Sequence, residues 1–271
     1  MNGTNRTNVA QKLLSLSLLA LTLATPAWAN DACKHLVISG NPEYPPYLWR
    51  DPADESKLIG ANADLMQLLA AELGITIEMK YGGPWGRVQE DVRNGRIDAI
   101  AGAFFTLPRL QYMDYFYPAF QGTRTVIWTR ADSRIKYQRW NDLANLQGVT
   151  VINNSFGEAF DRYAKESLTI TSVPNLEQAL RMLKASRADY LIYEDNPGMA
   201  FAARFNITGL KTVLPAITNE NLYLTLSHKS ACNTGEFRGR VSAAMYKLMQ
   251  QKPMNKLIDT NIQRWQNPRA N

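Results

Sequence analysis

Short apolar runs alternate with longer amphipathic stretches along most of the chain. Apolar runs of four or five residues predict strands, whereas longer stretches with apolar residues three or four positions apart predict helices. The strands predicted in this way are 36–39, 75–79, 97–101, 125–128, 149–152, 190–193 and 222–226, and the helices are 64–73, 85–94, 157–166, 177–185, 239–250 and 254–265. The alternation is typical of an α/β fold. Because one β/α series follows another, the pattern predicts two lobes with a crevice for a small ligand between them.

The first 29 residues have a different pattern, which is typical of a signal peptide. Arg6 and Lys12 give a positive region, 13–23 is apolar, and small residues follow up to Ala29. The apolar run is too short for a membrane-spanning helix, which needs about 20 residues. We therefore expect export of the chain with cleavage after Ala29, and no membrane span.

The charge of the chain points to no nucleic-acid partner. The formal net charge is +6 at pH 7, and the charged residues are spread along the sequence. No run of lysine and arginine suggests a nucleic-acid surface. A diffuse positive field can assist the capture of anions or simply keep the protein soluble.

The two cysteines of the chain, Cys33 and Cys232, both follow the predicted signal peptide. An even number of cysteines in an oxidising compartment indicates a disulfide, and two isolated thiols are the alternative. A bridge that closes so long a loop stabilises the fold by about 4 kcal/mol in the chain-entropy account.

The residue patterns of common enzymes are missing from the sequence. His35 and His228 are far apart, so a zinc site has little support. There is no G-x-S-x-G motif, 153–157 lacks the lysine of a phosphate loop, and 82–86 lacks the dinucleotide spacing. We therefore expect a protein that is not an enzyme and that holds no cofactor or metal.

Several segments, in their order along the chain, resemble the bacterial extracellular solute-binding proteins of the polar-amino-acid type, the receptors of ABC importers. The matching segments are 36–47, 60–65, 94–99, Thr106-Leu107-Pro108-Arg109, 113–116 and 186–190. Together they cover nearly the whole chain after the signal peptide.

This resemblance implies a type II periplasmic binding protein fold, with two α/β lobes joined by two hinge strands. The first lobe is expected to be 30–121 plus 222–271 and the second 122–221, which places both cysteines in the first lobe. The resemblance also implies a monomer in the periplasm that closes on a small-molecule ligand and delivers it to an inner-membrane ABC permease.

The resemblance assigns the carboxylate of the ligand to Arg109. A planar guanidinium can form two parallel charge-assisted hydrogen bonds with a carboxylate. Ala103, Phe104 and Phe105 match the stretch where the family presents backbone and hydroxyl groups to the ligand. Phe104 and Phe105 stand where the family usually has serine or threonine, so the sequence predicts an amino-acid-like ligand without identifying it.

The remaining site residues follow from the same resemblance. Tyr44 and Tyr47 match the aromatic residues that cover the ligand from the first lobe, whereas Trp85 is interpreted as a core residue. Asn154 and Ser155 match polar groups at a helix N-terminus in the second lobe, although Ser155 can instead cap that helix. The acid expected to receive the ligand ammonium is Glu194 or Asp195, and the sequence does not choose between them.

Two other functions remain open at this point. Periplasmic cyclohexadienyl dehydratases resemble the same family, and a carboxylic acid such as Glu194 can act as a general acid. A ligand-sensing receptor subunit is the other alternative, and it requires a partner that transmits the signal.

Overall fold

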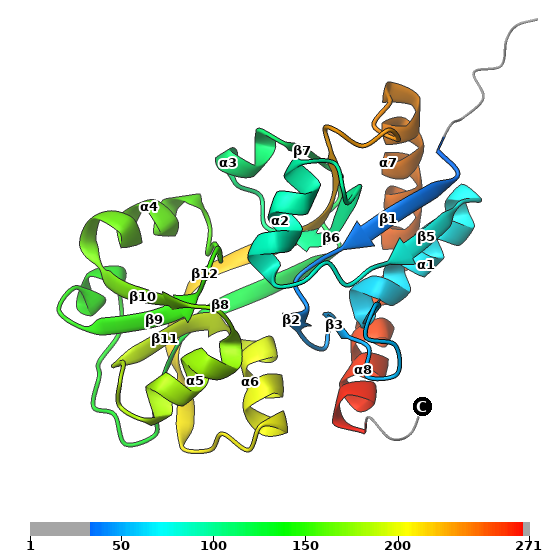
Figure 1. The fold of residues 1–271 in the computed structure, drawn as a ribbon. Coiled ribbons are helices and arrows are strands. Elements are labelled where there is room, and N and C mark those ends of the chain that lie inside the picture. Colours follow the sequence, from blue (N-terminus) through cyan, green and yellow to red (C-terminus); the bar gives the residue numbers. More distant parts are fainter. Residues whose placement is uncertain (1–32, 268–271) are drawn as a thin grey trace, which may run out of the picture. The chain divides into compact units, whose positions relative to one another are not determined.

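The computed structural model describes residues 33–267. The predicted signal peptide, 1–29, lies outside the described residues. The described part has one long sheet with the strand order β10-β9-β11-β8-β12-β6-β1-β5 (Figure 1). Its strands are β1 (His35–Ser39), β5 (Thr76–Met79), β6 (Ala99–Ala103), β8 (Gln121–Arg130), β9 (Gln147–Val151), β10 (Thr169–Val173), β11 (Tyr190–Glu194) and β12 (Leu210–Ser227).

One half of this sheet, β5-β1-β6, is parallel and lies between two helical layers. Successive side chains of β6 point to opposite faces, as in any strand. Ala99 and Ala101 pack in the core cluster of α1 (Ala61–Leu73) and α7 (Gly235–Gln250), whereas Ile100 packs against α2 (Trp85–Arg93). The helix α8 (Pro253–Gln266) packs on α1.

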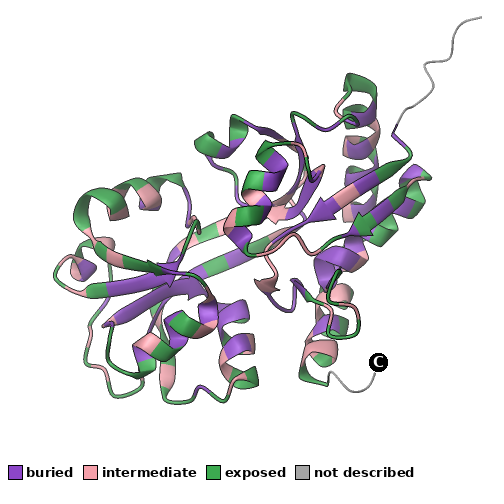
Figure 2. Cartoon of the chain, in the orientation of Figure 1, coloured by how far each residue is buried: buried purple, intermediate pink, exposed green. Residues whose placement is uncertain are grey.

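The other half of the sheet has the same layered construction. In β11, Leu191 and Tyr193 face α5 (Leu176–Lys184) and α6 (Asp195–Arg204), whereas Tyr190 and Ile192 face α4 (Glu158–Ser167). Figure 2 shows that strands such as β6 and β11 are buried, whereas the outer faces of the helices are exposed. Each lobe is thus a sheet covered on both faces, which is the arrangement predicted from the alternating pattern.

Two long antiparallel strands, β8 and β12, pass from one half to the other. Their pairing is regular from Leu210 to Val213 and from Thr218 to Leu222, with an irregularity between Val213 and Thr218. β12 then continues onto β6 and β7 (Met113–Tyr115) of the first half. These two strands correspond to the two expected hinge strands, and the lobe boundaries at 121–122 and 221–222 stay a prediction.

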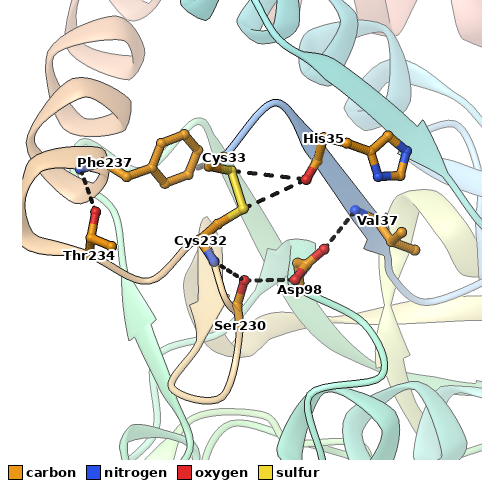
Figure 3. Close-up of a disulfide and its surroundings, with 8 residues drawn as sticks. All are labelled: Cys33, His35, Val37, Asp98, Ser230, Cys232, Thr234 and Phe237. Carbon is orange, nitrogen blue, oxygen red and sulfur yellow. Dashed lines mark hydrogen bonds between the residues drawn. A yellow bond between two sulfur atoms is a disulfide. The ribbon is translucent and has the colours of Figure 1, made fainter. Parts of the chain in front are cut away.

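The predicted disulfide is present between Cys33 and Cys232 (Figure 3). It joins the residue that precedes β1 to the loop that precedes α7. Asp98 supports the same loop, because its carboxylate accepts hydrogen bonds from the Ser230 hydroxyl (2.7 Å) and from the backbone N–H of Val37 (2.9 Å).

The predicted strands and helices all correspond to elements of the structure, but the sequence analysis missed others. The missed elements are β2 (Glu43–Tyr44), β3 (Leu48–Arg50), β4 (Leu58–Ile59), α3 (Leu107–Leu110), β7, the 3-10 helix η1 (Trp140–Leu143), β10 and α6. α6 contains Pro197, which the helix tolerates because the N–H groups of the first turn have no partner inside the helix.

Candidate functional site

The expected ligand-binding residues meet where several strands end. Loops that follow β1, β6 and β9, together with the last residue of β11, converge on one cavity, as ligand sites do at the carboxyl edge of such sheets. The cavity of about 30 Å³ is lined by Asn41, Tyr44, Trp85, Gly102, Ala103, Phe104, Arg109, Asn154, Ser155, Glu194 and Leu222. Seven of the nine predicted ligand-binding residues are in this lining, and they come from both lobes.

Arg109 lies on the short helix α3 and is 6 % exposed. Its guanidinium donates hydrogen bonds to the Phe104 carbonyl (3.0 Å) and to the Gln89 side chain (3.4 Å), and it lies 5.4 Å from the centre of the Trp85 ring. The Tyr115 hydroxyl also donates to the Phe104 carbonyl (2.7 Å). These contacts fix the guanidinium at the cavity wall, and a guanidinium in such a position can form charge-assisted hydrogen bonds with an anion.

Glu194 is the acid that lines the cavity, at the end of β11. The pKa of its carboxyl is raised from 4.5 to about 7, mainly by burial; the charge of Asp195 contributes in the same direction, whereas Arg109 opposes it. One carboxyl oxygen is buried with no hydrogen-bond partner among the described residues. A buried oxygen of this kind is a binding position for a donor such as an ammonium group.

Two other polar groups at the cavity are also unpartnered. The Tyr44 hydroxyl and the side-chain nitrogen of Asn154 are buried without a hydrogen-bond partner within residues 33–267. A buried polar group without a partner costs free energy, about 1–3 kcal/mol. A ligand that supplies the missing partners therefore gains affinity from groups on both lobes.

Ser155 lines the cavity and also interacts with its own helix. Its hydroxyl donates a hydrogen bond to the Asp161 carboxylate, and the backbone N–H of Phe156 donates to the same carboxylate (2.8 Å). Gly157 occupies the N-cap position of α4, and no side chain caps this helix. Ser155 is thus not the N-cap residue, and Asp161 holds the loop that carries it.

Tyr47 and Asp195 do not line the cavity. Tyr47 is fully buried, and its hydroxyl accepts a hydrogen bond from Asn196 (3.2 Å). The Asp195 carboxylate pairs with Arg124 of the hinge strand β8, with an N–O distance of 2.5 Å. Because alternate residues around the end of β11 point in different directions, only one of the two neighbouring acids reaches the cavity.

Four lining residues were not among the predicted ligand-binding residues, namely Asn41, Trp85, Gly102 and Leu222. Trp85 belongs to a core cluster, as expected, and also forms part of the cavity wall. Gly102 has φ of +112°, and a Cβ atom there would lie 2.8 Å from the Asn62 side chain. The position of Asn41 directly after the first strand is the sequence signal that could have identified it.

The cavity is small for a ligand. A volume of about 30 Å³ holds roughly one or two water molecules, whereas pockets for small molecules measure about 300 Å³ or more. A cleft of about 540 Å³ adjoins it at Trp85, which lines both spaces. The cavity in this arrangement of the lobes is therefore too small for a molecule of the size of an amino acid.

Within residues 33–267 there is no group of three or more histidine, cysteine, aspartate or glutamate side chains placed to hold a metal ion. None of the helices in that range combines the length and the apolar character needed to cross a bilayer.

A two-lobed α/β fold with polar groups from both lobes around one cavity defines the class of two-lobed solute-binding proteins. The chain matches the family model of bacterial extracellular solute-binding proteins, family 3, over residues 36–264, and it belongs to this family.

Solved structures share the fold at low sequence identity. A histidine kinase sensor domain with similarity to periplasmic binding proteins superposes with a TM-score of 0.72 at 23 % identity, over 85 % of this chain and 96 % of that one. The amino-acid ABC transporter substrate-binding protein AbpA from Streptococcus pneumoniae, bound to L-arginine, superposes with a TM-score of 0.69 at 20 % identity, over 86 % of this chain and 96 % of that one. An ancestral arginine-binding protein bound to glutamine superposes with a TM-score of 0.68 at 17 % identity, over 84 % of this chain and 97 % of that one.

Proposed function

We propose that this protein is a periplasmic receptor that captures a small amino-acid-like ligand and delivers it to an ABC importer. The observation that carries the proposal is the cavity in which Arg109 and Glu194 face the same space from different lobes. The guanidinium receives the carboxylate of the ligand, and Glu194 receives its ammonium group. Asn154, Ser155 and Tyr44 complete the polar contacts.

Binding is coupled to hinge closure in this proposal. β8 and β12 bend to open the lobes, and the ligand favours the closed state to the extent that it contacts both lobes. The signal peptide, 1–29, directs the chain to the periplasm, where Cys33 and Cys232 form their disulfide. The protein acts as a monomer.

A thermal-shift screen tests the proposed ligand class. The screen covers amino acids, with arginine and glutamine included because related structures contain them, and also polyamines and organic acids. A ligand that binds only the folded state raises the melting temperature, by an amount that grows with its concentration relative to Kd. We expect the strongest shifts from molecules with both a carboxylate and an ammonium group.

Arg109→Ala is the decisive variant for the carboxylate contact. It should abolish the shift given by the best ligand, whereas Arg134→Ala, on an exposed arginine outside the cavity lining, should retain it. An unchanged shift in Arg109→Ala would show that the carboxylate binds elsewhere.

A sensing role is the second candidate, because the fold is shared with a histidine kinase sensor domain. Transport and sensing use the same ligand contacts and differ in the partner. Uptake of radiolabelled ligand by cells that lack the protein separates them: unchanged uptake favours sensing, and lost uptake favours import.

An enzymatic role is the third candidate, and the pKa of Glu194 near 7 is the observation that favours it. A buried acid with such a pKa is suited to general acid catalysis. Incubation of the purified protein with prephenate or arogenate should leave both compounds unchanged, and formation of an aromatic product would establish the dehydratase function.

A further inference from the structure

A second hollow lies between α6 and α8 and shares no lining residue with the cavity of Arg109. It is a groove of about 630 Å³, a volume within the usual range for small-molecule sites. Figure 1 shows the two helices facing each other across this space. Most of its lining is apolar, with Met199 and Ala203 on α6 and Ile258, Ile262 and Trp265 on α8.

The aromatic part of the groove is held in place by several contacts. The indole N–H of Trp265 donates a hydrogen bond to the Ala200 carbonyl (3.1 Å). The Trp265 ring lies 5.6 Å from Phe201 and 5.4 Å from Trp49, measured between ring centroids. Because Ala200 and Phe201 lie on α6 and Trp265 lies on α8, their contacts join the two helices that form the groove.

The groove also carries one positive charge. Arg204 is exposed, and its guanidinium lies 4.4 Å from the centre of the Trp265 ring. No carboxylate of the described residues pairs with Arg204 within 4.0 Å, and no acid is among the lining residues. An apolar groove with one unpaired cation at its wall is complementary to an apolar molecule that carries a single negative charge.

We propose that the groove between α6 and α8 binds a small aromatic carboxylate. Its ring system packs against Met199, Ile258 and Ile262, and its carboxylate pairs with Arg204. This site is separate from the proposed amino-acid site, and its existence does not depend on that site.

The position of the groove links the second site to lobe closure. α6 packs in the core of the second lobe, whereas α8 is tied to the first lobe through the hydrogen bond from Asn261 to Asp64 (2.6 Å). A molecule that contacts both helices favours the arrangement in which they face each other. By reciprocity, it tightens binding at the Arg109 cavity by the same factor by which a ligand there tightens the groove.

The test uses 2-naphthoate as the probe and its neutral analogue 2-naphthamide as the comparison, with binding measured by isothermal titration calorimetry. We expect one 2-naphthoate per chain with a Kd on the order of 10–100 μM and weaker binding of the amide. Arg204→Gln should weaken naphthoate binding about tenfold and leave the amide unchanged. Arg204→Lys should restore part of the loss, and Ala203→Trp should block both compounds by filling the groove.

Two control variants test whether naphthoate binds in this groove and nowhere else on the protein. Arg134→Gln, on an exposed arginine far from the groove lining in sequence, should bind 2-naphthoate like the wild type. Arg109→Ala should retain naphthoate binding, because that residue lies in the other cavity. Circular dichroism spectra and melting curves establish that each variant is folded.

Three results would overturn the proposal: no binding of 2-naphthoate up to about 1 mM, equal affinity of the wild type and Arg204→Gln, or loss of binding in Arg109→Ala. A concentration-dependent dimer in sedimentation that Ala203→Trp abolishes would also overturn it, because the occupant of the groove would then be a second copy of the chain.

Discussion

At the scale of single residues, Glu194 is a buried acid whose environment differs strongly from water. It lies at the end of β11, 3 % exposed, and burial raises its pKa to about 7. In the unfolded chain the same carboxyl titrates at 4.5. Between these values the folded protein holds a proton that the unfolded chain has lost, so the stabilisation from this proton is complete below pH 4.5 and is lost as the pH rises to about 7.

We predict that Glu194→Gln removes this pH dependence. The free energy of unfolding of the wild type, relative to that of the variant, should fall by about 3 kcal/mol between pH 4.5 and 7.5, since one pKa unit corresponds to about 1.4 kcal/mol. Urea unfolding followed by circular dichroism without ligand measures both proteins. Glu236→Gln, on an exposed acid of α7, should follow the wild type. Parallel pH profiles of the wild type and Glu194→Gln would contradict the assignment.

The same residue predicts how ligand binding depends on pH. A ligand ammonium group prefers the ionised carboxylate, so affinity should rise from pH 5 to about 7 and then level off. The charge of Arg109 favours the ionised form of Glu194, whereas the charge of Asp195 disfavours it. Calorimetric titration at several pH values measures the effect, and Glu194→Gln should bind weakly with a flat profile.

At the scale of elements, the sequence predicts the strands and helices whose hydrophobic pattern directly reflects which of their faces are buried. The run 190–193 is apolar because both faces of β11 are covered, and 177–185 is amphipathic because α5 buries one face. α6 escaped prediction because its first turn contains Asn196, Pro197 and Gly198, a sequence typical of a turn. The helix α6 is stabilised by packing on β8 and β11, and the sequence of the segment itself does not reveal this tertiary contact.

The site residues divide in the same way: local sequence places some of them, and contacts with residues distant in sequence decide the others. Ala103 ends β6, Arg109 follows it on α3, and Ser155 lies in the loop after β9, so their positions follow from the ends of predicted strands. The choice between Glu194 and Asp195 depends on Arg124, which is distant in sequence and pairs with Asp195. Tyr47 was predicted beside Tyr44, but its hydroxyl bonds to Asn196 rather than lining the cavity.

The disulfide provides a testable prediction at the scale of elements, because it joins the segment before β1 to the loop before α7. The double variant Cys33→Ser/Cys232→Ser should lower the free energy of unfolding by about 4–5 kcal/mol, because the unfolded chain regains the freedom of a loop of 199 residues. Urea unfolding with and without dithiothreitol measures this. The reductant should destabilise the wild type and leave the double variant unchanged, and ligand affinity should be the same in both proteins at low urea. A double variant as stable as the wild type would contradict the prediction.

At the scale of the whole molecule, several hydrogen bonds join the two lobes outside the cavity. The Glu43 carboxylate accepts from the backbone N–H of Leu176 at the start of α5 (3.0 Å), and the Gln89 side chain donates to the Asn153 carbonyl (3.2 Å). The Glu158 carboxylate accepts from the N–H of Leu107 (3.3 Å). These contacts form only when the lobes are together, so they contribute to closure independently of any ligand.

Glu43 offers the sharpest test of this contribution. Its carboxylate lies at the N-terminus of α5, where the helix dipole favours negative charge, an interaction worth about 0.3–1 kcal/mol in addition to the hydrogen bond. Burial nevertheless raises the pKa of Glu43, which indicates that desolvation offsets part of the gain. Removing the carboxylate should therefore shift the lobes toward the open state with a modest loss of affinity.

We predict that Glu43→Ala weakens binding of the ligand found by the screen about fivefold, which corresponds to about 1 kcal/mol. Glu43→Gln should lose less, because its amide oxygen can still accept from Leu176 without the charge. Small-angle X-ray scattering of the ligand-free protein should give a larger radius of gyration for Glu43→Ala, whereas Glu55→Ala, on an exposed acid paired only within the first lobe with Arg50, should match the wild type. If Glu43→Ala keeps both the affinity and the radius of the wild type, the hydrogen bond from Leu176 to Glu43 makes no measurable contribution to closure.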